Sequence, residues 1–227
     1  MSAAPSGYQT GSQQSPQALQ PLQPPVLSDT TGRIGGVTEI PDWLSTTLAA
    51  DAAGVDAALP TWIHALSPEA NVAGPALVVH VATNDNQPMR DVPTAVTTPG
   101  TILVVAGAAE SRTAILGDLV ARELLAAGVI GVVTDGLIRD SREVASLGLP
   151  VWGRGATPVA SAKRGPGSVG GEVQLAGLAV NDGDLVVADA DGVVVWRRED
   201  IPKLIVAAEA KRQADEDRLA KLTSSPD

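Results

Sequence analysis

Three charged residues in the middle of the chain are spaced so that they could share one site. Twenty residues separate Asp118 from the adjacent pair Arg139-Asp140. The planar guanidinium of an arginine can hold a carboxylate through two hydrogen bonds or stabilise an enolate oxygen. Aspartate carboxylates are hard oxygen donors that suit Mg²⁺ or Mn²⁺, and such ions commonly keep several waters. The pattern therefore suggests a site shared by a divalent metal and an anion.

Each of these residues also has a purely structural interpretation. Asp140 is followed three residues later by Glu143, so Asp140 could be the N-cap of a helix with a capping box. Asp118 and Arg122 have the spacing of an ordinary surface ion pair on a helix. The residue types alone leave both interpretations open.

A βαβ unit is expected to position the three residues. The apolar runs 101–106 and 129–134 predict buried strands, and apolar residues that recur every three or four positions predict a helix from about Ala114 to Ala127. Gly128 stands where a helix commonly ends in a left-handed residue. Consecutive parallel strands joined in this way bind ligands at their carboxyl ends, beside the N-terminus of the following helix. Asp118 would lie there, near backbone N–H groups that suit a carboxylate ligand.

The flanking segments extend this α/β pattern. Residues 76–82 predict a further strand, in which His80 is expected to be a core residue. An Ala-rich helix is expected within 44–59, a short helix after Asp140, β-rich segments from 172 with a turn at Asp191-Gly192, and an amphipathic helix over 200–222. A short helix and a loop are expected within 27–37.

Composition narrows the classes of protein. The 227 residues are 44% hydrophobic with no Phe, so the core must be aliphatic. A net charge of −10 argues against nucleic acid as a direct ligand, and the absence of Cys excludes disulfides and thiolate chemistry. The N-terminus lacks the features of a signal peptide and no apolar run is long enough for a membrane span, so a cytoplasmic protein is expected.

We therefore expect a disordered tail at 1–25, one α/β domain at 26–200, and a C-terminal amphipathic helix with a frayed end at 201–227.

Several motifs together resemble the 4-hydroxy-4-methyl-2-oxoglutarate aldolase family, which also contains the regulator of ribonuclease E activity A. They are Asp118 with Arg139-Asp140, the surrounding GVIGVVTDGLIRD, and the segments VAGPALVV, TPGTILVVAG, GRGATP and NDGDLVVADADGVVV. The resemblance covers roughly residues 26–200. It implies a β/β/α swivelling-type domain, assembled as a homotrimer or a dimer of trimers with sites between subunits.

The resemblance also implies roles for individual residues. Gly117, Asp118, Leu119 and Val120 would hold the substrate carboxylate through backbone amides, and Arg139 would contact the 2-oxo acid. Asp140 would bind Mg²⁺ (or Mn²⁺) directly, and Asp118 would bind it through water. A further carboxylate would come from the C-terminal region of a neighbouring subunit, and Glu209 and Glu216 are the candidates.

Two kinds of function follow. The first is a metal-dependent (class II) pyruvate aldolase that cleaves a 4-hydroxy-2-oxo acid and also decarboxylates oxaloacetate. The alternatives are a non-catalytic regulator that inhibits a ribonuclease or helicase, or the same scaffold acting on another 2-oxo acid. Family members that lack an acidic residue at position 118 resemble the regulator, so Asp118 favours the enzyme. A Schiff-base mechanism is disfavoured, because Lys163 is the only lysine near the core region and its loop is expected to be exposed.

Overall fold

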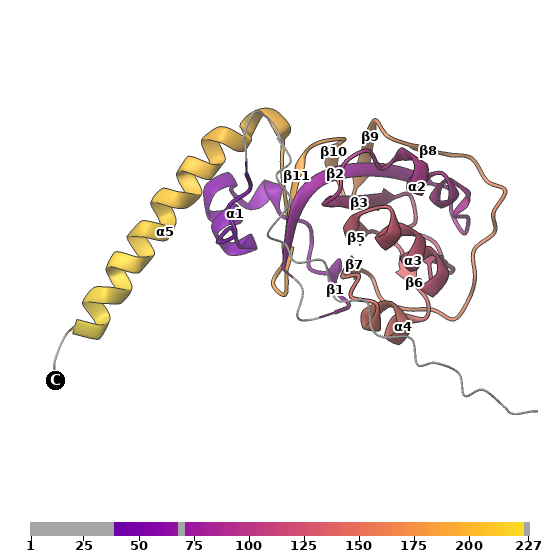
Figure 1. Ribbon diagram of the computed structural model, residues 1–227, viewed down its shortest axis with the longest axis horizontal. Helices are drawn as coiled ribbons and strands as arrows, with labels where there is room; N and C mark the ends of the chain where they lie inside the picture. The colour runs from indigo at the N-terminus through magenta and orange to yellow at the C-terminus, as the bar shows by residue number, and fades with distance from the viewer. Residues whose placement is uncertain (1–38, 68–70, 225–227) are drawn as a thin grey trace, which may run out of the picture.

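The computed structural model describes residues 39–67 and 71–224 of the chain. The predicted disordered tail and the short helix expected within 27–37 lie outside these residues. The fold is α/β, as predicted, with a curved sheet, helices on one face and a long C-terminal helix (Figure 1).

A parallel set of four strands forms the centre of the sheet. These strands are β2 (Val72–Val81), β3 (Thr101–Ala106), β5 (Val129–Thr134) and β7 (Val151–Gly153). The sheet order is β1-β7-β5-β3-β2-β11-β12, with β8 (Gly167–Val169) also paired to β2. The outer strands β1 (His64–Ala65), β11 (Leu185–Asp189) and β12 (Gly192–Trp196) pair antiparallel to their neighbours. The predicted parallel βαβ unit is thus confirmed, because β3 pairs directly with β5.

Both faces of the central strands are buried, which explains why they read as continuous apolar runs. On one face Leu103 and Val105 of β3 pack with α2 (Val92–Ala95), α3 (Asp118–Ala126) and α4 (Ser141–Ser146). On the other face Ile102 and Val104 pack against the hairpin of β9 (Glu172–Leu175) and β10 (Leu178–Asn181). The order of layers is therefore hairpin, sheet and helices, which is the predicted β/β/α arrangement.

A third apolar cluster joins the first and last α-helices of the described residues. The helix α1 (Thr46–Ala53) and the start of α5 (Ile201–Ser224) pack on β11 and β12, with Trp196 and Leu185 buried between them. The remainder of α5 extends away from the body, at the opposite end of the molecule from α3, β6 and α4 (Figure 1). None of the helices in the described part of the chain is long and apolar enough to cross a lipid bilayer.

Two predictions were wrong, one about the segment before α3 and one about His80 in β2. Residues Ala114–Leu116 form a short strand, β4, and α3 begins only at Asp118. The apolar residues there are buried because β4 pairs in parallel with β6 (Leu137–Ile138), not because they line a helix. His80 is exposed, since the apolar cluster on its face of β2 ends at Val78.

Candidate active site

Gly117 is the centre of the candidate site because it begins helix α3. It is the N-cap residue, with an extended φ of −139° and no side chain to cap the helix. The first intrahelical hydrogen bond runs from Ala121 N–H to the Gly117 carbonyl, at 2.9 Å. The amides of Asp118, Leu119 and Val120 precede this bond, and first-turn amides have no intrahelical acceptor. The N-terminus of α3 therefore offers N–H groups and a positive dipole end to an anion.

The small sheet of β4 and β6 brings Arg139 and Asp140 to this helix N-terminus. Leu116 is opposite Ile138 in the parallel register, and Arg139 N–H donates to the Leu116 carbonyl at 3.0 Å. Gly117 follows β4 directly, and Arg139 follows β6 directly. Since the strands are parallel and their last residues, Leu116 and Ile138, are paired, the residues that follow them lie side by side.

The approach of these side chains to Gly117 is close. A Cβ placed on Gly117 would lie 2.5 Å from Asp140 Oδ2 and 2.8 Å from Arg139 Nε. Asp140 Oδ2 lies 3.2 Å from Arg139 Nε and accepts a long hydrogen bond of 3.4 Å from Asp118 N–H. The structure thus places the Asp118 backbone and the side chains of Arg139 and Asp140 together around Gly117.

Asp140 is not acting as a helix cap. It occupies the N-cap position of α4, but its side chain makes no capping hydrogen bond there. Its backbone has left-handed dihedral angles, φ 50° and ψ 41°, which are unfavourable for a residue with a Cβ. This conformation coincides with a carboxylate directed toward α3, and strained residues of this kind concentrate at functional sites. The alternative Asp118–Arg122 ion pair is also absent from the ion pairs within residues 39–67 and 71–224.

A small pocket of about 80 Å³ opens at this point. The helix N-terminus and Arg139 form one side of it, through Gly117, Leu119 and Val120. Asp118 and Asp140 are not among its lining residues and adjoin it through Gly117. The rest of the wall comes from Asn86, Ala114, Leu116, Ala160, Ser161 and Lys163.

Asn86 and Lys163 were not identified from the sequence as site residues. Asn86 is 7% exposed, and its Nδ2 donates to the Ile115 carbonyl at 2.7 Å. That bond fixes the amide orientation and leaves Oδ1 as a buried acceptor that has no partner among the described residues. A buried polar atom without a partner is costly, so it points to a donor supplied by a ligand or a water. Lys163 lies in an exposed loop, as expected, but this loop borders the pocket.

The donor set fits a hard divalent cation that keeps most of its waters. Mg²⁺ is commonly held by one or two carboxylates with water completing the octahedron. The Asp140 carboxylate lies at the Asp118 backbone amide, so both aspartates belong to this part of the site. Within the described residues no group of three or more His, Cys, Asp or Glu side chains could hold a metal. If a divalent cation binds here, Asp118 and Asp140 are the residues of this chain that could contribute ligands to it.

Asp135, in the loop between β5 and β6, has a structural role. Its carboxylate accepts hydrogen bonds from the N–H groups of Ala108 at 2.8 Å and Gly107 at 3.1 Å. Burial raises the pKa of Asp135, and these two backbone hydrogen bonds oppose that shift. The residue ties the segment after β3 to the segment after β5, which leads directly into β6.

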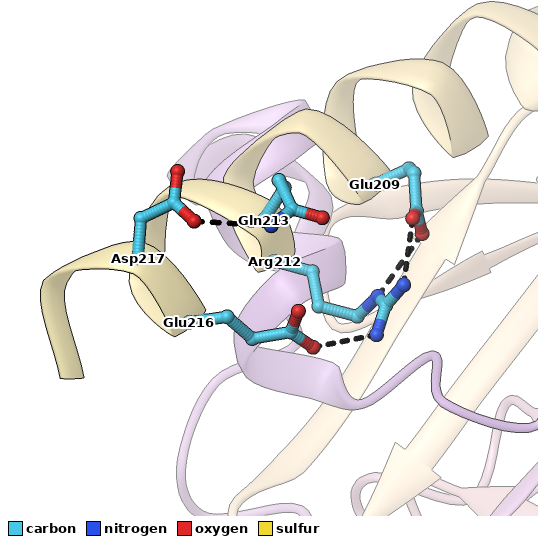
Figure 2. Close-up of polar contacts among 5 residues, drawn as sticks. All are labelled: Glu209, Arg212, Gln213, Glu216 and Asp217. Carbon is cyan, nitrogen blue, oxygen red and sulfur yellow. Dashed lines mark hydrogen bonds and ion pairs between the residues drawn. The ribbon is translucent and has the colours of Figure 1, made fainter. Parts of the chain in front are cut away.

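Glu209 and Glu216 lie on α5, away from the pocket of their own chain. Both bind the same guanidinium, with Arg212 Nη2 at 2.7 Å from Glu209 and Nη1 at 2.6 Å from Glu216 (Figure 2). The hydrogen bond from Arg212 lowers the pKa of Glu209. Arg212 also lies over the ring of Trp43, 5.1 Å from its centroid. Either carboxylate could reach a site only in a neighbouring copy, and it would have to leave Arg212 to do so.

Comparison with known proteins gives a consistent result. The family model described as "RraA-like: Aldolase/RraA" matches residues 46–195. A protein of Halalkalibacterium halodurans named "Putative 4-hydroxy-4-methyl-2-oxoglutarate aldolase" is 34% identical over 175 residues, which is 77% of this chain and 83% of that protein.

Two solved structures share the fold. One is Streptomyces coelicolor RraAS2, described as an unusual member of the RNase ES inhibitor RraA protein family. It is 29% identical, with a TM-score of 0.70 over 78% of this chain and 93% of that one. The other is an uncharacterized protein from Pseudomonas syringae, with a TM-score of 0.71 over 82% of this chain and 87% of that one. At 24% identity the second comparison shows the fold alone.

Proposed function

Because the chain belongs to the RraA-like family of aldolases and RraA proteins, we propose that it is a divalent-metal-dependent lyase. Its substrate would be a 4-hydroxy-2-oxo acid of the 4-hydroxy-4-methyl-2-oxoglutarate type, cleaved to pyruvate. The observation that carries the proposal is the convergence of Asp118, Arg139 and Asp140 on Gly117, beside a pocket at the N-terminus of α3.

Different residues around the pocket would bind the carboxylate and the 2-oxo oxygen of the substrate. The amides of Leu119 and Val120 and the guanidinium of Arg139 are donors directed to a carboxylate at one end. Arg139 also places positive charge where negative charge develops on the 2-oxo oxygen as the C–C bond breaks. Asp140 holds Arg139 by its Nε, which leaves the terminal nitrogens of the guanidinium for the substrate.

Asp140 and Asp118 would hold the divalent metal, with Asp118 acting through water. When bound, the metal supplies Lewis-acid stabilisation of the enolate charge that forms during cleavage. The proton of the substrate hydroxyl must leave for the aldol bond to break, and we propose that a water molecule in the site accepts it as the base. Cleavage and decarboxylation both transfer an electron pair to the 2-oxo acid, so we also propose oxaloacetate decarboxylation.

We further propose that the active form is a homotrimer or a dimer of trimers. The described part of one chain lacks a third metal-binding carboxylate near Asp140, and α5 carries Glu209 and Glu216 away from the body. A neighbouring copy could bring one of them to the site.

The decisive experiment is pyruvate release from 4-hydroxy-4-methyl-2-oxoglutarate and from oxaloacetate, measured with Mg²⁺, with Mn²⁺ and with excess EDTA. We expect turnover that depends on the metal and falls steeply in Asp118→Ala. Full activity in EDTA would refute the metal-dependent mechanism. Because Lys163 borders the pocket, borohydride treatment with pyruvate is a necessary second test, and a trapped adduct on Lys163 would indicate a Schiff base instead.

A non-catalytic regulator is the second candidate function. It is favoured by the structural similarity to RraAS2, whose family is described as inhibiting RNase ES. The variant Asp118→Ala separates the two functions. Binding of a ribonuclease or helicase partner would be indifferent to this change, whereas lyase activity would be lost.

A further inference from the structure

Asp85 joins two segments that are far apart in the sequence. Its carboxylate is buried and accepts hydrogen bonds from Gln87 N–H through Oδ1, at 2.8 Å, and from Arg164 N–H through Oδ2, at 2.9 Å. The backbone of Asp85 forms a parallel bridge with Ala162. In that bridge Ala162 N–H donates to the Asn84 carbonyl and Asn86 N–H donates to the Ala162 carbonyl, each at 3.0 Å.

We call the contacts of Asp85 with Gln87, Ala162 and Arg164 the Asp85 joint. Residues next to this joint line the pocket. Asn86 follows Asp85 in the chain, and Lys163 lies between Ala162 and Arg164, which are both bound at the joint. Asn86 and Lys163 both line the pocket, together with the first residues of α3. The joint therefore sets how far apart the Asn86 amide and the Lys163 ammonium group are held.

The segment around Lys163 packs tightly on the Asp85 carboxylate. A Cβ on Gly165 would lie 2.8 Å from Asp85 Cγ, so no larger residue fits there without a shift. The hydrogen bond from Arg164 N–H lowers the pKa of Asp85, so the group is ionised at neutral pH. A charged acceptor makes hydrogen bonds that are shorter and stronger than those of a neutral one.

We propose that Asp85 is a positioning residue for the lyase reaction, which holds the loop carrying Lys163 against the turn carrying Asn86 and so shapes the substrate pocket. The proposal rests on the proposed function, because it takes this pocket as the substrate site. Asp85 itself does not line the pocket. It acts through Asn86 and Lys163, which do.

The variant Asp85→Asn is a sharp test because it preserves shape and removes one acceptor. An amide group would direct an N–H donor at the N–H of Gln87 or Arg164, and one side of the joint would open. The matched control is Asp91→Asn, since Asp91 is exposed and its side chain does not cap the adjacent helix α2. If Asp85→Asn does not fold, Gly165→Ala tests the same joint by forcing a methyl group against the carboxylate.

Two measurements are needed. The first is hydrogen–deuterium exchange of the segment 159–166, which we expect to be faster in Asp85→Asn and unchanged in Asp91→Asn. The second is a double-mutant cycle on kcat/KM with Asp85→Asn and Lys163→Ala. We expect Asp85→Asn to lower kcat/KM by about 10- to 100-fold, the loss associated with displacing a binding group by roughly 1 Å. In the Lys163→Ala background the same change should cost much less, because the group it positions is gone.

The outcomes separate the two proposals. Unchanged exchange in the segment, or additive effects of Asp85 and Lys163 on kcat/KM, would overturn the positioning role. Faster exchange with unchanged kcat/KM would overturn it as well. A wild-type protein that releases no pyruvate would refute the proposed lyase, and with it any role of Asp85 in that reaction. Faster exchange of segment 159–166 in Asp85→Asn would even then show that Asp85 holds this segment in place.

Discussion

Replacing Gly117 by alanine isolates the geometry of the site from the stability of the fold. The backbone at Gly117 is extended, with φ −139°, so a side chain causes no backbone strain. The added Cβ would instead meet three side-chain atoms, which are Asp140 Oδ2 at 2.5 Å, Arg139 Nε at 2.8 Å and Arg139 Cγ at 2.9 Å. All three belong to the residues proposed to bind metal and substrate.

The size of the effect follows from these distances. Ordinary van der Waals contact begins near 3.4 Å, so the Asp140 oxygen must withdraw by about 0.9 Å and the Arg139 nitrogen by about 0.6 Å. A displacement of about 1 Å in a catalytic group can cost roughly 100-fold in rate. Because Asp140 and Arg139 are both displaced, we expect kcat/KM to fall by at least about 100-fold. Stability should change little, since both side chains are about one third exposed and can move toward solvent.

The assay is pyruvate release with Mg²⁺, alongside thermal unfolding of the same samples. Gly117→Ser is the informative companion variant, because serine is a better N-cap than alanine by about 1 kcal/mol but carries the same Cβ. We expect Gly117→Ser to be at least as stable as Gly117→Ala and equally inactive. If either variant retains activity within a few-fold of the wild type, the close approach at Gly117 is not part of the active geometry.

Three further predictions concern other parts of the molecule. Leu124→Ala should lower the free energy of unfolding by about 2–5 kcal/mol, because Leu124 is on the fully buried face of α3. Leu119→Ala should change it by less than about 0.5 kcal/mol, because Leu119 is 67% exposed. Denaturant titrations measure both values. Asp140→Gly should abolish lyase activity and leave unfolding stability unchanged or higher by up to about 1 kcal/mol, because glycine adopts the left-handed conformation without penalty, and a clear loss of stability would contradict this. Because the pKa of Asp85 is lowered in the folded state, chiefly by the Arg164 N–H, its contribution to stability is present above the unfolded pKa and lost as pH falls through the folded pKa. Unfolding midpoints measured from pH 6 to pH 3 should therefore decline less steeply in Asp85→Asn than in the wild type.

The parts of the fold that were predictable from the sequence are those governed by local pattern. The strands 101–106 and 129–134 were predicted with their observed bounds, because strands buried on both faces leave uninterrupted apolar runs. Gly128 has the expected positive φ of 92° after α3. The βαβ unit places Asp118 at the N-terminus of α3 as expected, but Arg139 and Asp140 reach it through the β4–β6 pair, which was not predicted.

The errors arose where burial came from pairing between distant segments. Ala114–Leu116 has apolar residues at helical spacing relative to α3, but it is a strand because β6 is available to pair with it. Asn86 and Lys163 are 77 positions apart in the sequence and meet only through the Asp85 joint, which no periodicity signals. A carboxylate that accepts backbone hydrogen bonds is indistinguishable, in sequence alone, from one that is solvated.

The same point bears on the choice between enzyme and regulator. A regulator of a basic partner would need an acidic surface, and the chain has a net charge of −10. Asp182 accepts hydrogen bonds from the N–H groups of Val78 and Gly171. Asp85, Asp135, Asp184 and Asp189 likewise accept backbone N–H groups, and all but Asp189 are buried. Five of the 26 acidic residues are thus explained by loop structure, so their carboxylates are already engaged by backbone N–H groups. Asp140 is different, because it has left-handed backbone angles and its carboxylate is directed at Arg139 and the N-terminus of α3 instead of capping its own helix.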